Sequence, residues 1–265
     1  MIDLHLHTPR CGHACGTIDE YVAAARRAGV ATMCFTDHLP LPEGYPTGYA
    51  MSWPELPLYV DEVRAAAAVA VADGGPEVLC GVEADWTPDA HMLVTGAVEE
   101  HGFDVVLGSV HMIDGWAFDD PNELAGYESW DIGDLWDRYF ALLEAAAASG
   151  LYDVMAHPDL VKKFGFRPLS GPTHWYEEAA AVFAEHGVAV EVNAAGLRKP
   201  VGEIYPSLGF LEACRRRGVP ATTGSDAHRP EEVGSGLVAA RDLLEAAGYS
   251  SLVVFRARVP EEVAL

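Results

Sequence analysis

Six of the eleven histidines in this chain end short apolar runs, and a seventh follows in the first loop. Two carboxylates, Glu83 and Asp226, occupy similar positions. Neutral imidazole together with carboxylate is typical of zinc, manganese or iron sites, whereas calcium and magnesium prefer oxygen ligands throughout. The candidate metal ligands are therefore His5, His7, His13, His38, Glu83, His111, His157, Asp226 and His228.

Nine candidate ligands exceed the four that one tetrahedral ion needs. We therefore expect two or three ions, with a carboxylate such as Glu83 bridging a pair. Any one of these histidines could be an ordinary core or surface residue, so their shared placement carries the argument. Burying so many polar groups without a metal leaves donors and acceptors unsatisfied, which is costly. A metal core with a purely structural role remains an alternative.

The apolar runs are short enough to be strands, and longer helical patterns or loops separate most of them. Capping boxes at Thr17–Glu20 and Ser52–Glu55 predict helices that stop near Gly29 and Gly74. Further helices are expected over residues 134–148, 173–186, 206–217 and 231–247. The strands are expected over residues 2–7, 32–37, 78–83, 105–111, 154–157, 188–193 and 221–226.

Strands that alternate with helices predict an α/β fold built from parallel βαβ units. Periodicity does not distinguish an open sheet from a closed barrel, but the polar residues favour a barrel. In α/β barrels the loops after the strands form one common face, so distant strand ends converge on one cleft. Within the first strand, a period of two places Asp3, His5 and His7 on the same face.

Composition limits the partners of this chain. With 265 residues, half of them hydrophobic, it can bury a full core, and we expect a single domain over residues 1–265. Seventeen basic against forty acidic residues give a net charge of −23, which repels nucleic acid and anionic lipid. The start lacks a signal-peptide pattern, and no apolar run is long enough to span a membrane, so a cytoplasmic location is expected.

Five scattered cysteines suit a reducing compartment rather than a disulfide framework. Cys11 and Cys15 flank His13, but they lack a second cysteine pair at zinc-ribbon spacing, so thiolate ligation is the weaker interpretation.

The strand-end motifs resemble the polymerase-and-histidinol-phosphatase (PHP) family over essentially the whole chain. The matching motifs are His5-x-His7-Thr8, Asp37-His38, Glu83, His111, His157 and Asp226-x-His228. This resemblance implies a distorted seven-stranded (β/α) TIM-like barrel with a trinuclear site. It assigns His5, His7, Glu83 and Asp226 to the first metal, Glu83, His111 and His157 to the second, and His13, His38 and His228 to the third.

Residues 156–165, 193–200 and 224–230, together with Gly12-His13, resemble the histidinol-phosphatase branch of the family. The activity implied is hydrolysis of L-histidinol phosphate to L-histidinol and phosphate in histidine biosynthesis. Three alternatives stay open: a PHP-type phosphoesterase acting on nucleotides or other small phosphate esters, a more distant amidohydrolase-like enzyme, and a metal-binding module without turnover.

Few cations stand near the expected cleft. Arg198 and Arg229 follow strands that feed it and are candidates for forked phosphate contacts and a catalytic role. Lys162 and Lys163 are further substrate-binding candidates, although loop lysines are often simply solvated. Asp37 either donates the leaving-group proton or holds an imidazole through a hydrogen bond.

The segment from 112 to 134 is long, aromatic and acidic. Aromatic faces and carboxylates suit a substrate with a cationic amine and an imidazole, so this segment either covers the substrate or is an exposed connector. The remaining histidines are expected at the surface: His91, His101, His174 and His186.

Overall fold

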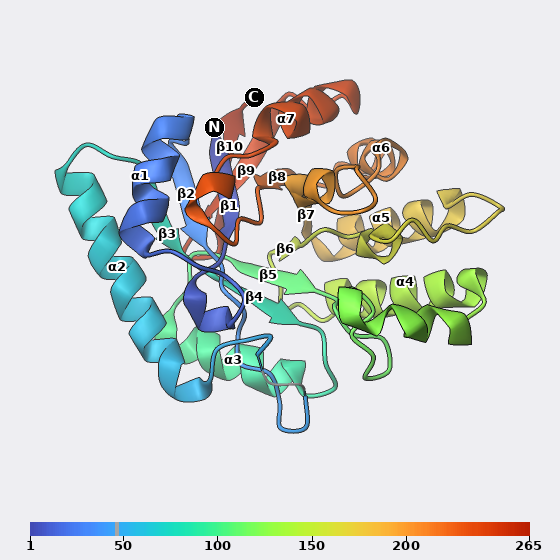
Figure 1. Cartoon of the computed structure of the whole chain (residues 1–265). Coiled ribbons are helices and arrows are strands. Elements are labelled where there is room, and N and C mark those ends of the chain that lie inside the picture. The colour runs from blue at the N-terminus through green and yellow to red at the C-terminus, as the bar shows by residue number, and fades with distance from the viewer. Residues whose placement is uncertain (46–47) are drawn as a thin grey trace.

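A closed ring of parallel strands forms the centre of the molecule in a computed structural model that describes residues 1–45 and 48–265 (Figure 1). Hydrogen bonds join the strands in two groups, β1-β2-β3 and β4-β5-β6-β7-β8. The strands are β1 (Ile2–Leu6), β2 (Thr32–Phe35), β3 (Glu77–Cys80), β4 (Val82–Asp85), β5 (Val106–Ser109), β6 (Val154–Met155), β7 (Ala189–Asn193) and β8 (Ala221–Gly224).

Two details make this ring a distorted seven-stranded barrel. Only Gly81 separates β3 from β4, so these two segments form one interrupted strand. A side chain at Gly81 would come within 2.6 Å of the Val105 carbonyl oxygen, which is too close. A bridge between Leu6 and Ala227 joins β1 to the residues just after β8 and closes the ring. The predicted seven-stranded barrel is confirmed, and each expected strand is present.

In the described parts of the chain, seven α-helices pack around the strands (Figure 1). The capping box of Thr17 and Glu20 opens α1, and Gly29 ends it as predicted. The Ser52–Glu55 box opens a 3-10 turn that leads into α2. The helices are α1 (Ile18–Ala28), α2 (Leu56–Ala72), α3 (Ala90–His101), α4 (Ile132–Ala148), α5 (Thr173–His186), α6 (Leu208–Arg216) and α7 (Leu237–Ala246).

The helices differ from the prediction in two places. Helix α3 was not expected. The last helix begins at Leu237 rather than near residue 231, because Gly234 and Gly236 adopt positive φ angles of 74° and 79° that interrupt a helix.

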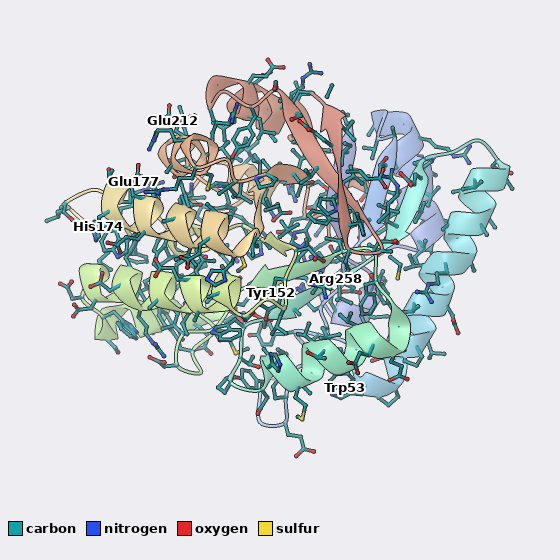
Figure 2. All side chains as sticks on the ribbon, turned by 180° about the vertical axis from the view of Figure 1, so that it is seen from behind. Trp53, Tyr152, His174, Glu177, Glu212 and Arg258 are labelled. Carbon is teal, nitrogen blue, oxygen red and sulfur yellow. The ribbon has the colours of Figure 1, made fainter. Side chains whose placement is uncertain are left out.

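A C-terminal hairpin of β9 (Ser251–Arg256) and β10 (Val259–Ala264) was also not expected. Its turn binds the segments that precede β5 and β6: Arg258 Nε lies 3.0 Å from Asp153 Oδ2, and the Ala257 amide donates to Asp104 Oδ1. Figure 2, seen from behind, shows Arg258 at this end of the ring. The hairpin therefore covers the amino ends of the strands and leaves the carboxyl ends for a site.

The first strand departs from simple alternation. Its register with β2 shifts between Asp3 and Leu6, which is the signature of a bulge. Asp3 was predicted to lie on the same face of this strand as His5 and His7, but its side chain has other partners than theirs. Its buried carboxylate instead accepts hydrogen bonds from the Ser225 amide and hydroxyl and from the Gly234 amide. This carboxylate ties β1 to the segment after β8.

No helix in the described parts of the chain is both long and apolar enough to cross a membrane.

Candidate metal centre

The carboxyl ends of the strands surround a cleft of about 450 Å³. Eight of the nine predicted ligands line it, and the ninth, His5, is fully buried behind Glu83. The lining ligands are His7, His13, His38, Glu83, His111, His157, Asp226 and His228. The structure thus brings together side chains that lie more than two hundred residues apart in the sequence, while their individual roles as ligands stay a prediction.

Glu83, on β4, is the centre of this group, and imidazoles face both of its oxygens. On one side, Oε2 lies 3.1 Å from His5 Nε2, 3.3 Å from His38 Nδ1 and 3.6 Å from His7 Nε2. On the other side, Oε1 lies 2.9 Å from His157 Nε2 and 3.6 Å from His111 Nε2. A carboxylate that faces two separate histidine groups is suited to bridge two ions.

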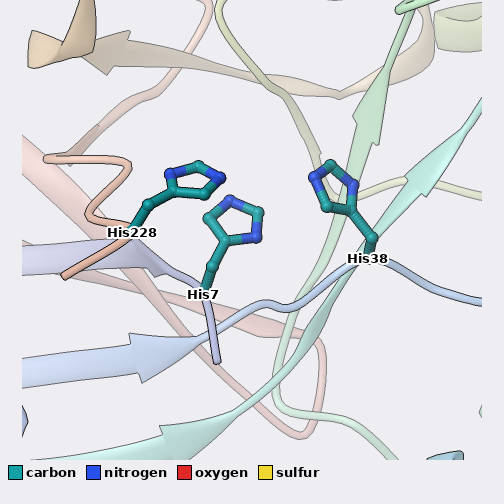
Figure 3. A group of neighbouring side chains, drawn as sticks. All are labelled: His7, His38 and His228. Atoms are coloured by element: carbon teal, nitrogen blue, oxygen red, sulfur yellow. The ribbon is translucent and has the colours of Figure 1, made fainter. Parts of the chain in front are cut away.

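A second group of imidazoles, which shares His7 and His38 with the first, lines the same cleft. Figure 3 shows His7, His38 and His228 gathered there, with one donor atom of each within 4.8 Å of the others. The His13 ring stacks on His228 with 4.8 Å between centroids. Asp226 Oδ1 lies 3.3 Å from both His7 Nε2 and His228 Nδ1. Three imidazoles this close to one another, with a carboxylate beside two of them, can hold a further ion.

The hydrogen bonds of the site test whether these residues fit metal ions. The Nδ1 atoms of His38 and His157 are buried and have no hydrogen-bond partner among the described residues. An unpaired buried polar atom is costly unless something satisfies it. The nearest charged group to His38 Nδ1 is Glu83 Oε2 at 3.3 Å, and the rings beside His38 and His157 are other imidazoles. Divalent cations suit this donor set.

The charges of the site are strongly coupled. Burial disfavours a charged His7, but hydrogen bonds with Asp226 and Asp37 raise its pKa to about 9. Burial likewise opposes a charged His111, and Asp85 and Glu83 raise its pKa to about 10. Burial lowers the pKa of His38 to about 4 despite Glu83 nearby. Protons and metal ions therefore compete for the same rings.

Three further carboxylates each face the Nδ1 atom of one predicted histidine ligand. Asp85 Oδ1 is 2.9 Å from His111, and Glu191 Oε1 is 2.8 Å from His5. Neither Asp85 nor Glu191 was predicted from the sequence to belong to the site. Each lies two residues from a strand-end polar residue, Glu83 or Asn193, so the same period of two could have found them.

Asp37 is the third of these carboxylates. It lies 3.4 Å from His7 Nδ1, and it accepts hydrogen bonds from the Thr8 hydroxyl and the His38 amide. Burial raises its pKa, but the bonds with His7 and Thr8 lower it overall. Asp37 is therefore a buried, ionised carboxylate whose oxygens already accept hydrogen bonds. This favours its role of holding the His7 imidazole over the role of proton donor to the leaving group.

The four predicted cationic residues lie in different places. Arg229 and Lys163 line the cleft. Arg198 does not, and its Nη2 instead donates to the carbonyl oxygens of Ser225 at 2.8 Å and Asp226 at 3.1 Å. Arg198 therefore supports the loop that carries Asp226.

The structure does not support the predicted substrate role of Lys162. Its side chain is fully buried, away from the cleft lining, and its Nζ lies 2.9 Å from Asp159 Oδ2 and 2.7 Å from Ser207 Oγ. It stabilises the turn after β6 as part of a buried ion pair.

The segment 112–134 forms one wall of the cleft. Asp119 and Asp120 line it, together with Met112, Ala117, Pro121 and Asn122. Trp116 instead packs edge-on against Tyr127 at 4.8 Å. The carboxylates of this segment thus face the cleft, while Trp116 anchors the wall.

Residues 3–195 match the PHP domain family, and residues 211–246 match the PHP-associated family. This chain belongs to the PHP domain family. The PHP domain chain is 44% identical over 234 residues to a probable histidinol-phosphatase of Deinococcus radiodurans, with 88% of each chain covered. It is 26% identical to the histidinol-phosphatase of Bacillus subtilis, over 88% of this chain and 95% of that one.

Solved structures confirm the fold. The PHP domain chain superposes on histidinol phosphate phosphatase from Lactococcus lactis, solved with zinc, L-histidinol and phosphate, with a TM-score of 0.85, 20% identity and 98% coverage of both chains. It superposes on a histidinol phosphatase structure from Listeria monocytogenes with a TM-score of 0.80, 20% identity, and coverage of 90% and 99%.

Proposed function

We propose that this protein is a metal-dependent phosphomonoesterase that hydrolyses L-histidinol phosphate to L-histidinol and phosphate in histidine biosynthesis. The observation that carries this proposal is the placement of Glu83, whose two oxygens face five histidines, four of which line the cleft. Similarity at 44% identity to a probable histidinol-phosphatase supports the choice of substrate.

Two or three divalent ions, zinc, manganese or iron, would be held by the nine predicted ligands. Glu83 would bridge the ions held by His5, His7 and Asp226 on one side and by His111 and His157 on the other. A third ion would be held by His13, His38 and His228. When bound, such ions lower the pKa of water toward about 7 and neutralise charge on a phosphate ester.

The side chains around the ligands would bind the two ends of the substrate. Arg229 and Lys163 line the cleft and offer cationic donors to the phosphate oxygens. Asp119 and Asp120 line it as well and offer acceptors to a cationic amine or imidazole. A cleft with both charge types suits a small phosphate ester that also carries a positive charge.

We further infer that residues 1–265 act as one domain, because β1 and the segment after β8 share the Asp3 carboxylate and both carry ligands. Five free thiols, four of them buried, suit a cytoplasmic enzyme. The net charge of −23 argues against nucleic acid or a membrane surface as a partner.

The deciding experiment is a kinetic comparison of histidinol phosphate, nucleoside monophosphates and simple amides with the metal-loaded protein. We expect kcat/KM for histidinol phosphate to exceed the others by on the order of 100-fold or more. A chelator should abolish activity, added metal should restore it, and His111→Ala should remove it.

The other outcomes separate the alternatives. A preference for nucleotides would reject the substrate while keeping the reaction class, and cleavage of amides would reject the phosphatase assignment. Metal binding without turnover on any ester would indicate a non-catalytic module.

A further inference from the structure

Glu191 is a buried carboxylate on β7 that no ligand set includes, and only 1% of its surface is exposed. Three nitrogen atoms surround it. Its Oε1 lies 2.8 Å from His5 Nδ1, and its Oε2 lies 2.9 Å from the His157 amide and 3.1 Å from Asn193 Nδ2. One side chain thus contacts β1, the segment after β6, and β7.

The contact with His5 fixes which ring nitrogen is free. A carboxylate can only accept, so His5 Nδ1 must carry the proton in this bond. The Nε2 atom then carries the lone pair of the neutral ring, and it is the atom that lies 3.1 Å from Glu83 Oε2. Such a carboxylate behind a histidine holds both the tautomer and the orientation that metal ligation requires.

The contact with His157 acts on the backbone. His157 has a φ of 30°, a left-handed conformation that is unfavourable for residues other than glycine. The bond from its amide to Glu191 helps to hold that conformation. In it, His157 Nε2 lies 2.9 Å from Glu83 Oε1, on the side of the carboxylate opposite His5.

The neighbouring strand leaves room for this arrangement. Gly224 on β8 lies against both partners, and a Cβ atom there would collide with Glu191 Oε1 and with the Cβ of His5. The lack of a side chain at position 224 therefore allows the Glu191–His5 contact.

We propose that Glu191 is a positioning residue for the metal centre, and that it sets His5 and His157 on the two sides of Glu83 at once. The inference rests on the proposed metal site but not on which ester the protein hydrolyses. It assigns to Glu191 a control of metal affinity that the fold alone would not require.

The test measures metal affinity rather than turnover. Zn²⁺ affinity would be determined by competition with a chromogenic chelator for the wild type, Glu191→Ala and Glu191→Gln, with thermal unfolding recorded for each. We expect Glu191→Ala to weaken binding by about 10- to 100-fold. Glu191→Gln should recover part of the loss, because its single amide oxygen can still accept from His5. The visible spectrum of the Co²⁺-loaded protein should change in the same order.

Asp153→Asn is the matched control. Asp153 is also a largely buried carboxylate, bonded to Arg258 and the Val106 amide, but at the opposite end of the barrel. The Asp153→Asn substitution should lower stability and leave Zn²⁺ affinity and the Co²⁺ spectrum unchanged.

Wild-type Zn²⁺ affinity in folded Glu191→Ala would overturn the proposal. Failure of both Glu191 variants to fold would also overturn it, because the residue would then serve the fold. Since no ester is used, these outcomes are independent of substrate identity.

Discussion

Lys163 Nζ lies 2.9 Å from Asp119 Oδ2, and both side chains line the cleft that holds the predicted metal ligands. Burial raises the pKa of Asp119, but Lys163 and His111 lower it overall, so its carboxylate is ionised at neutral pH. An anionic side chain opposes phosphate binding, unless the substrate has a cationic end to place beside it.

We therefore predict that Asp119→Asn selectively weakens the binding of a substrate that carries a positive charge. KM for histidinol phosphate should rise about tenfold, equivalent to about 1.4 kcal/mol of binding, while hydrolysis of p-nitrophenyl phosphate stays unchanged. Asp114→Asn is the control, because Asp114 lies in the same segment but pairs with Arg138. Equal losses with both esters would show that Asp119 does not select the cation.

Arg229 and Arg198 should separate binding from loop support. The Arg229 side chain is 60% exposed at the cleft, so Arg229→Ala should raise KM for phosphate esters about 10-fold or more through loss of a charged hydrogen bond. Arg198→Ala should instead reduce kcat and metal content, because its partners are the carbonyls around Asp226. Steady-state kinetics with metal analysis checks both, and an unchanged KM in Arg229→Ala would contradict the first.

Lys162→Met tests the buried ion pair with Asp159. Removing one partner leaves an uncompensated buried charge, so unfolding free energy should fall by about 3–5 kcal/mol. Urea denaturation measures this change. A raised KM without loss of stability would instead restore a substrate role for Lys162.

Metal uptake by the metal-free protein should release protons at neutral pH. The pKa values of His7 and His111 are raised to about 9 and about 10, so both rings are protonated there, and a ligand must be neutral. Apparent affinity should therefore increase as pH rises toward those values. The same protons stabilise the metal-free fold at lower pH, and that contribution is lost as pH rises through about 9 to 10. Calorimetry in two buffers of different ionisation enthalpy would detect the release, and identical heats would argue against it.

Much of the centre was predictable because parallel strands bring their carboxyl ends to one face. His5, His38 and His157 could thus be placed together without knowledge of any distance. The ring nitrogen that each uses could not be predicted, since it depends on carboxylates such as Glu191 on other strands.

Other features depend on contacts that leave little mark on local sequence. The bulge near Asp3 breaks the period of two that the run itself displays. From the sequence, Lys162 resembles a solvated loop lysine, because its contacts with Asp159 and Ser207 exist only in the folded chain. The C-terminal hairpin was not predicted because all six residues of β10 are exposed and show no alternation of apolar and polar residues.

That hairpin also bears on how substrate reaches the site. Val254 and Phe255 of β9 are buried in one apolar cluster with Leu4 of β1, Val105 and Val154. Ester and products are therefore expected to enter and leave through the cleft at the carboxyl ends of the strands. Released phosphate must leave this cleft before another ester binds, so inorganic phosphate should act as a competitive inhibitor. A fusion partner attached after Leu265 would follow the hairpin, at the end of the barrel opposite the cleft, and should not block substrate entry.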